Sequence, residues 1–298
     1  MSNLTAYKDT GEILFDTNLI SYGLVKSGYL AYSQSWSRRE LRSAGLDPDQ
    51  GTNWTPVVIY SDSSFTDALY GFTVYNWISP ISFIVGPGCL NGTVINADGS
   101  MTFLYSNAGT GTKFYCFDLM ADSLAGSTFL KTWDTTGRIT FNSLQPPLNI
   151  VAAIQAPGPG TVDQYGRPVT TYAGGYTQKE AELGPASPYR RKRATSRVNI
   201  PLTAGVEYAA FLPWSRSVAF NDLYSFNGTD NSAQYGGQEG AYGYVGGISF
   251  MFGPSAGTTN AQLFTAGYSV PISFSNLPTD RYPVALVIAT TDLVFPYN

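Results

Sequence analysis

Hydrophobic and polar residues alternate with a period of about two in many short stretches of the chain. That period places successive side chains on opposite faces of an extended backbone, so it indicates β-strands. The strands predicted in this way cover residues 57–60, 71–78, 81–85, 101–105, 113–117, 148–154, 197–202, 206–212, 248–252, 270–274 and 284–289. Their spacing between turn residues predicts an all-β fold, made of β-sandwich or barrel-like domains with long loops and little helix.

One hairpin pattern occurs twice. Residues 7–17 align without gaps to residues 133–143, and both read aromatic, polar turn, Gly, charge, Ile, any residue, Phe. The core of the pattern returns at residues 99–103, again after an Asp. A polar turn that ends in Gly suits a β-hairpin because Gly adopts positive φ at no steric cost, and alternation then puts Ile13 and Phe15 on one face. A framework of repeated hairpins favours a structural or adhesive role over a catalytic one.

The composition changes in the middle of the chain. Between residues 156 and 197 the apolar runs stop, and five prolines and six glycines occur among 42 residues. Such a stretch is typical of a long exposed arm or a linker. We therefore expect a β domain with the repeated hairpin at residues 1–155, a Pro/Gly-rich basic loop or linker at 156–197, and a second β domain at 198–298. A single interleaved sandwich is the alternative.

A basic run lies within the expected linker. Arg190, Arg191, Lys192 and Arg193, with Arg197, place five of the chain's 17 basic residues within eight positions. The simplest interpretation is a solvated or inter-subunit loop. Contact with an anionic surface, such as the phosphates of lipopolysaccharide, is the alternative, with Arg190, Arg191 and Arg193 as candidate binding residues. One run without a basic face or interleaved aromatics does not indicate a nucleic-acid partner.

Residues 235–244 are rich in Gly and Tyr and resemble a flexible contact loop. Tyr supplies large amphipathic area and Gly supplies backbone freedom, a combination found in many binding loops. Tyr235, Tyr242 and Tyr244 are therefore candidate binding residues, and a subunit-contact or disordered loop is the alternative. Four tryptophans have rings suited to stacking on sugars, although most large aromatics in β proteins are core residues: Trp36, Trp54, Trp77 and Trp214.

The composition limits the chemistry. Only 13% of residues are charged, so a surface of Ser, Thr, Asn, Gln and Tyr suits packing against other subunits or binding sugars, and a net charge of −4 implies no polyanionic partner. The chain has no histidine, which removes Ser-His-Asp and Cys-His nucleophilic systems and His-ligated zinc. A carboxylate pair of the glycosidase type remains, with Asp62 and Asp67, or Asp222 and Asp230, as nominal pairs. We expect no enzymatic activity, no catalytic residue and no cofactor.

Cys89 and Cys116 are the two cysteines, and both stand among apolar residues. They are interpreted as reduced, buried side chains, with a disulfide as the alternative. The Asp-x-Asp-x-Gly sequence at residues 47–51 indicates an Asx turn, because the ligand set for calcium is incomplete. The N-terminus has no secretion signal, and no apolar stretch is long enough for a membrane helix. We therefore expect a soluble product of the cytoplasm with no membrane insertion and no metal.

The repeated motif carries a resemblance to a known family. Residues 4–17, the Tyr-x-Phe-Asp element at 115–118, the second copy at 133–143 and the Pro-Leu strand at 146–151 resemble a group of virion proteins of tailed bacteriophages. The resemblance covers about residues 1–155. It implies a minor tail, tail-tip or fibre component of a long-tailed phage, made in the cytoplasm of the host bacterium and located in the virion. It implies no enzymatic residues.

Three hypotheses follow. The first is a non-enzymatic structural protein of a phage tail, at the tail tip or its fibres, which assembles as a homo-oligomer with other tail proteins and supports host attachment. The second is a receptor-binding module that recognises a host surface polysaccharide or pilus. The third is a glycan depolymerase with paired carboxylates.

Overall fold

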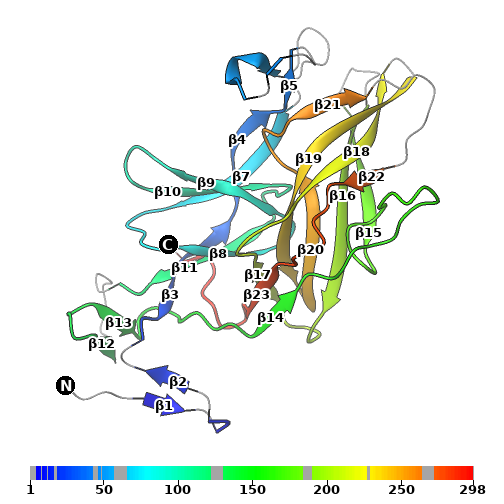
Figure 1. The fold of residues 1–298 in the computed structure, drawn as a ribbon. Coiled ribbons are helices and arrows are strands. Elements are labelled where there is room, and N and C mark those ends of the chain that lie inside the picture. The colour runs from blue at the N-terminus through cyan, green and yellow to red at the C-terminus, as the bar shows by residue number, and fades with distance from the viewer. Residues whose placement is uncertain are drawn as a thin grey trace.

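The computed structural model describes residues 5–297, except residues 8, 12, 17–18, 43–45, 48, 57–65, 122–129, 184–189, 227–228 and 264–271. Within the described residues the chain forms strands and turns, together with a single 3₁₀ turn, η1 (Gly51–Asn53). The all-β prediction is confirmed. Several sheets pack and curl into an arrangement that is part sandwich and part half-barrel (Figure 1).

The largest sheet has 13 strands. Its main path runs β14–β23–β17–β8–β19–β20–β16–β15, and five further strands pair along its length. The bounds of the 13 strands are β3 (Tyr22–Tyr29), β8 (Ile81–Val85), β11 (Lys113–Leu119), β14 (Ala152–Gln155), β15 (Tyr176–Leu183), β16 (Arg190–Pro201), β17 (Tyr208–Phe211), β18 (Ser217–Phe226), β19 (Thr229–Tyr244), β20 (Gly247–Pro254), β21 (Asn260–Leu263), β22 (Ser273–Ser275) and β23 (Val284–Ala289).

A four-stranded sheet packs against part of the large one and makes the sandwich. Its order is β4–β7–β10–β9, with bounds β4 (Ala31–Ser37), β7 (Thr66–Val74), β10 (Met101–Ser106) and β9 (Cys89–Ile95). Aromatic rings fill the space between the sheets. Phe72 of β7 stacks on Phe103 of β10 with ring centroids 4.9 Å apart, and on Phe114 of β11 at 3.7 Å. Because Phe114 belongs to the large sheet, this stack joins the two layers.

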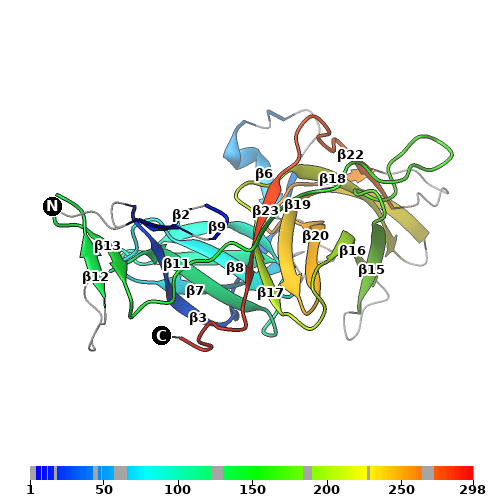
Figure 2. The ribbon, with the colours of Figure 1, turned by 90° about the horizontal axis from the view of Figure 1, so that it is seen from below.

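The remainder of the large sheet curls around a second core (Figure 2). Tyr172 lies inside this curl, fully buried, with its ring 5.5 Å from that of Phe252. Its hydroxyl donates a 2.8 Å hydrogen bond to Glu239 of β19, which also forms a buried ion pair with Arg216 at 2.7 Å. The core of the half-barrel is therefore aromatic, and the Arg216–Glu239 ion pair is buried within it.

Residues near the end of the chain cover the outer face of the large sheet. Phe295 and its neighbours pack on the cluster that contains Leu24 of β3. The backbone of Ser27, also in β3, donates a 2.8 Å hydrogen bond to Tyr297, and its hydroxyl donates one of 2.7 Å to the carbonyl of Val294. A strand from the first tenth of the chain is thus held by the last residues that the structure describes.

Two long strands lie where the sequence predicted a loop or linker. Residues 176–183 and 190–201 form β15 and β16, which pair with each other antiparallel, and β16 continues the sheet to β20. The linker prediction is wrong for residues 176–183 and 190–197, whereas the strand predicted at 197–202 coincides with the end of β16. Strands from residues 1–155 and 198–298 also pair directly, since β8 pairs with β17 and β14 pairs with β23. One continuous sheet therefore joins the two halves of the chain.

Three two-stranded sheets complete the described structure. They pair β1 (Thr5–Tyr7) with β2 (Ile13–Asp16), β5 (Arg39–Leu41) with β6 (Trp54–Pro56), and β12 (Lys131–Trp133) with β13 (Ile139–Asn142). Among the predicted strands, those at 81–85, 101–105, 113–117, 248–252 and 284–289 are confirmed as β8, β10, β11, β20 and β23. The predicted strand at 57–60 lies outside the described residues.

Candidate functional site

Two of the three candidate tyrosines are buried, so the contact-loop prediction is wrong for them. Tyr235 and Tyr242 lie in β19, a strand of 16 residues, and are only 3% and 6% exposed. The Tyr235 ring stacks on Phe220 with centroids 5.2 Å apart, and its hydroxyl accepts a 3.3 Å hydrogen bond from the backbone of Ala194. Tyr244, at the end of β19, is partly buried, and burial raises its pKa.

The glycines of β19 explain why this Gly/Tyr-rich segment is a packed strand and not the predicted loop. A Cβ atom at Gly237 would lie 2.0 Å from the Phe220 ring, one at Gly240 would lie 2.6 Å from the carbonyl oxygen of Gly88, and one at Gly243 would lie 1.7 Å from that of Tyr208. No side chain fits at such distances, so Gly is required for close approach of the backbone. The Gly/Tyr composition of residues 235–244 therefore belongs to a central strand whose backbone lies very close to its neighbours.

The basic run lies in β16, and its side chains are outside what the structure describes. The backbone register places Arg193 opposite Glu180 and Arg191 opposite Glu182 of β15. Opposite charges at facing positions of an antiparallel pair stabilise the pairing by about 0.2–1 kcal/mol each. Glu180 and Glu182 stand at alternate positions of residues 176–183. This spacing is the sequence signal that the basic run pairs with a second strand. The anionic-surface hypothesis for Arg190, Arg191 and Arg193 stays a prediction.

The carboxylates nominated for glycosidase chemistry do not form an open pair among the described residues. Asp67 is buried and accepts two hydrogen bonds from the Arg38 guanidinium, at 2.8 and 3.0 Å. Asp62 lies outside the described residues, and the side chains of Asp222 and Asp230 do as well. The part of the chain that the structure describes also holds no group of three or more His, Cys, Asp or Glu side chains placed to bind a metal.

The two cysteines are free and buried, as predicted. Burial raises the pKa of Cys89 to about 12 and that of Cys116 still further, so both thiols are protonated at neutral pH and unreactive. The predicted Asx turn is confirmed too, because the backbone of Asp49 donates a 2.9 Å hydrogen bond to the Asp47 carboxylate.

The repeated pattern forms two hairpins of the same geometry, as the sequence predicted. In the first, β1–β2, Tyr7 pairs with Ile13 and the register shifts just before Tyr7. In the second, β12–β13, Trp133 pairs with Ile139 after the same shift. The glycine of each turn has positive φ, +83° and +81°. Tyr7 and Trp133 hold equivalent positions, both are exposed, and both hairpins lie at one end of the molecule (Figure 1).

An Asp carboxylate organises the turn of the second hairpin and recurs elsewhere. Asp134 accepts hydrogen bonds from the backbone and hydroxyl of Thr136, at 2.8 and 2.7 Å, and from the Arg138 side chain at 3.1 Å. Asp163 accepts the same kind of contact from Arg167 at 2.8 Å, across a turn with the same Asp-x-x-Gly-Arg sequence. This second turn was not predicted from the sequence, although both turns share the same five-residue spacing.

We expect the second hairpin to lose order in acid. The Thr136 hydroxyl, followed by the backbone of Arg138, lowers the pKa of Asp134 to about 2. A carboxyl whose pKa is lowered in the folded state stabilises that state above its unfolded pKa of about 4, and this contribution disappears as the pH falls through the folded value. NMR shifts of the Thr136 and Gly137 amides should therefore change between about pH 3 and pH 1, centred on the folded pKa of about 2, whereas in Asp134→Ala they should not titrate there. Shifts of the native chain that stay constant over this range would contradict the prediction.

A second exposed feature is an open groove of about 480 Å³ beside Trp36, which we call the Trp36 groove. Its lining combines an indole, a guanidinium and two hydroxyls: Ser35, Trp36, Ser37, Arg39, Pro56 and Gly257. The buried Arg38 fixes this segment, because its guanidinium pairs with Asp67 and lies 4.2 Å from the centre of the Tyr235 ring. Its neighbour Arg39 is exposed.

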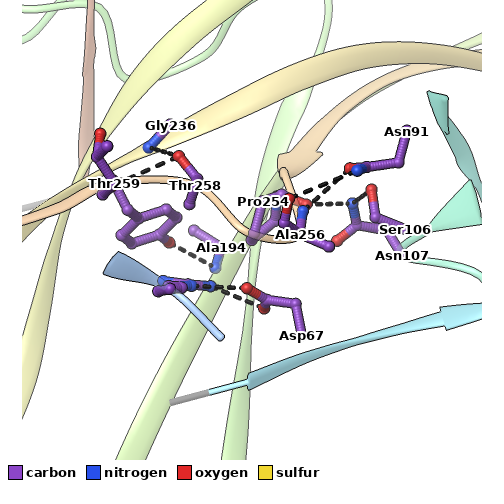
Figure 3. Close-up of polar contacts among 12 residues, drawn as sticks. Asp67, Asn91, Ser106, Asn107, Ala194, Gly236, Pro254, Ala256, Thr258 and Thr259 are labelled. Atoms are coloured by element: carbon purple, nitrogen blue, oxygen red, sulfur yellow. Dashed lines mark hydrogen bonds and ion pairs between the residues drawn. The ribbon is translucent and has the colours of Figure 1, made fainter. Parts of the chain in front are cut away.

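The wall of the Trp36 groove is a tightly held turn at residues 254–259. Figure 3 shows this turn between Asn91 and Asn107 on one side and Gly236 on the other. Asn91 accepts a 3.0 Å hydrogen bond from the Ala256 backbone, Asn107 donates one of 2.9 Å to the Pro254 carbonyl, and Gly236 donates one of 3.0 Å to the Thr258 hydroxyl. The groove is therefore bounded by a well-anchored turn.

Comparison with known proteins gives no relative. No protein-family model, curated protein or solved structure matches the chain. Among the described residues, no helix has the length and apolar character needed to cross a membrane.

Proposed function

We propose that the chain is a non-enzymatic structural component of a bacteriophage tail, at the tail tip or its fibres, which assembles as an oligomer and supports host attachment. The observation that carries the proposal is the pair of equivalent hairpins. Both present an exposed aromatic residue, Tyr7 or Trp133, at the same position of the same register. They belong to the region, about residues 1–155, that resembles tailed-phage virion proteins.

Hairpins of this kind gain stability from contact with another surface. A two-stranded hairpin is marginally stable by itself in water. Ser21 already donates a 2.9 Å hydrogen bond to the Thr140 carbonyl in β13, so the exposed rings of Tyr7 and Trp133 are the surfaces that the hairpins offer. Two copies at one end of the molecule offer two similar surfaces, which suits repeated contacts within a symmetric assembly. Neighbouring subunits or other tail proteins are the proposed partners.

A receptor-binding module for host polysaccharide or pilus is the second candidate function, and the Trp36 groove is the observation that favours it. An indole next to a guanidinium and hydroxyls is a suitable surface for a saccharide. Depolymerase activity finds no such support, since Asp67 is already held by Arg38.

We expect the double variant Tyr7→Ala/Trp133→Ala to lose self-association while keeping its fold. Light scattering should give an oligomeric mass for the native protein and a monomeric mass for the variant, with equal melting temperatures. Tyr75→Ala is the matched control, because Tyr75 is exposed but lies outside both hairpins. An oligomer that persists in the double variant would contradict a role of the hairpins in assembly.

The location has its own test. Mass spectrometry of purified phage particles should detect the chain, and an antibody against it should label the tail in electron micrographs. Absence of the chain from purified particles would overturn the proposal.

A further inference from the structure

A small cavity opens between the two sheets of the sandwich, next to Trp214, and we call it the Trp214 pocket. It encloses about 90 Å³. Five parts of the chain meet there: β8, the start of β9, β10, β17 with the segment that follows it, and β19. Its lining includes Ser82, Ile84, Leu90, Tyr105, Trp214 and Glu239.

Two hydroxyls in this lining have unused hydrogen-bonding capacity. Ser82 Oγ and Tyr105 OH are the buried side-chain polar atoms, among the described residues, that no hydrogen bond satisfies. Both residues are 2% exposed. An unsatisfied buried hydroxyl costs about 1–3 kcal/mol, so a buried hydroxyl is normally paired with a protein group, a water or a ligand. Two of them in one cavity mark it as a place for a polar group.

Burial also keeps the Tyr105 hydroxyl protonated. It raises the pKa of Tyr105 well above its usual value, and the nearby Ser82 hydroxyl offsets a smaller part of this effect without forming a hydrogen bond of good geometry. Tyr105 and Ser82 are therefore both able to donate and to accept at any physiological pH.

The rest of the wall is electrically neutral. Glu239 contributes a carboxylate, but both of its oxygens accept hydrogen bonds from the Arg216 guanidinium, at 2.7 and 2.8 Å, and one also accepts from Tyr172. Ile84 and Leu90 add apolar surface to the lining. The pocket thus suits an uncharged group that carries both polar and apolar atoms.

The size of the cavity limits its occupant. Its volume is well below the roughly 300–1,000 Å³ of pockets that enclose a whole drug-sized ligand, yet several times the roughly 10–15 Å³ that one water requires. The cavity therefore admits one substituent of a ligand, while the rest of the ligand stays outside it. The exposed indole of Trp214 lies at the boundary with solvent, where a flat apolar ring face is able to stack on it.

We propose that the Trp214 pocket binds an N-acetylhexosamine unit of a surface glycan. The pyranose ring stacks on Trp214, and the acetamido group enters the pocket. Its carbonyl and N–H then meet the hydroxyls of Ser82 and Tyr105, while its methyl group packs against Ile84 and Leu90. The Trp36 groove lacks a comparable pair of unsatisfied hydroxyls among its lining residues. For its biological meaning this inference rests on the proposed role in host attachment.

Saturation-transfer NMR on the full chain tests the inference with two probes, methyl N-acetyl-β-glucosaminide and methyl β-glucoside. We expect transfer to the acetyl methyl group of the first probe and little transfer to the second, which lacks the acetamido group. Equal transfer to both probes, or none to either, would overturn the inference. The oligomeric mass and the presence of the chain in phage particles would still stand as separate tests of the proposed function.

Single variants test whether the probe binds at the Trp214 pocket. Trp214→Ala should abolish transfer, whereas Tyr75→Ala, which removes an exposed aromatic ring outside the pocket lining and outside both hairpins, should leave it unchanged. Loss of transfer in Trp36→Ala with retention in Trp214→Ala would move the site to the groove and overturn the inference. Tyr105→Phe keeps the ring and removes one hydroxyl, so affinity should fall about fivefold, the value of one neutral hydrogen bond. An unchanged affinity in this variant would overturn the role of the hydroxyl.

Discussion

Replacing Glu239 by Gln should lower the free energy of unfolding by about 3–5 kcal/mol. The substitution keeps the shape of the side chain but leaves the Arg216 guanidinium without its counter-charge. Arg216 and Glu239 are 1% and 0% exposed, so water does not replace the missing partner. An isolated buried charge carries nearly its full desolvation cost, and this is why breaking a buried pair has a much larger effect than the pair contributes in net terms.

Equilibrium urea unfolding measures this effect, and the chain offers a matched control. Glu207 pairs with Lys113 at 2.8 Å, but both side chains are about a quarter exposed. Glu207→Gln should therefore cost less than about 1 kcal/mol, as is usual for pairs in contact with solvent. The double variant Arg216→Met/Glu239→Gln should recover part of the loss because it removes the orphaned charge. Equal effects of Glu239→Gln and Glu207→Gln would show that burial does not control the energetics of these pairs.

Gly243→Ala should prevent the native fold or destabilise it by more than about 4 kcal/mol, at the extreme of single substitutions. The added methyl group would lie 1.7 Å from the Tyr208 carbonyl oxygen and 2.7 Å from the backbone nitrogen of Ala209. These are backbone atoms of β17, so no side-chain rotation relieves the overlap. The strands β17 and β19 would have to separate, and the large sheet would open at its centre.

Soluble yield and thermal unfolding report this loss. Gly111→Ala is the matched control, because a Cβ atom there meets nothing within 4 Å and the backbone does not have positive φ. We expect the control to melt within a few degrees of the native protein. A Gly243→Ala variant as stable as Gly111→Ala would mean that β17 and β19 are not packed as closely as described.

The hairpins and many core strands were predictable from the sequence because their signals are local. Residues 7–17 and 133–143 share the turn glycine and the aromatic position, and these residues set the register that both hairpins adopt. Strands such as β11 and β20 are continuous apolar runs between turns, which is typical of strands buried on both faces.

The remaining elements depend on contacts between distant residues. The glycines of β19 resemble loop glycines until the backbone of β17 is known to lie against Gly243. The Trp214 pocket joins residues 82, 105, 214 and 239, so its two unsatisfied hydroxyls belong to no local pattern. Trp214 was a candidate for sugar stacking from sequence, but the hydroxyls beneath it were not recognisable.

The hydrogen bonds between Ser27 and residues 294–297 have a consequence for synthesis of the protein on the ribosome. β3 is among the first strands to leave the exit tunnel, yet its outer face gains its cover only when residues more than 260 positions later have emerged. Until then the nascent chain exposes the apolar face around Leu24, and exposed apolar surface of this kind favours aggregation.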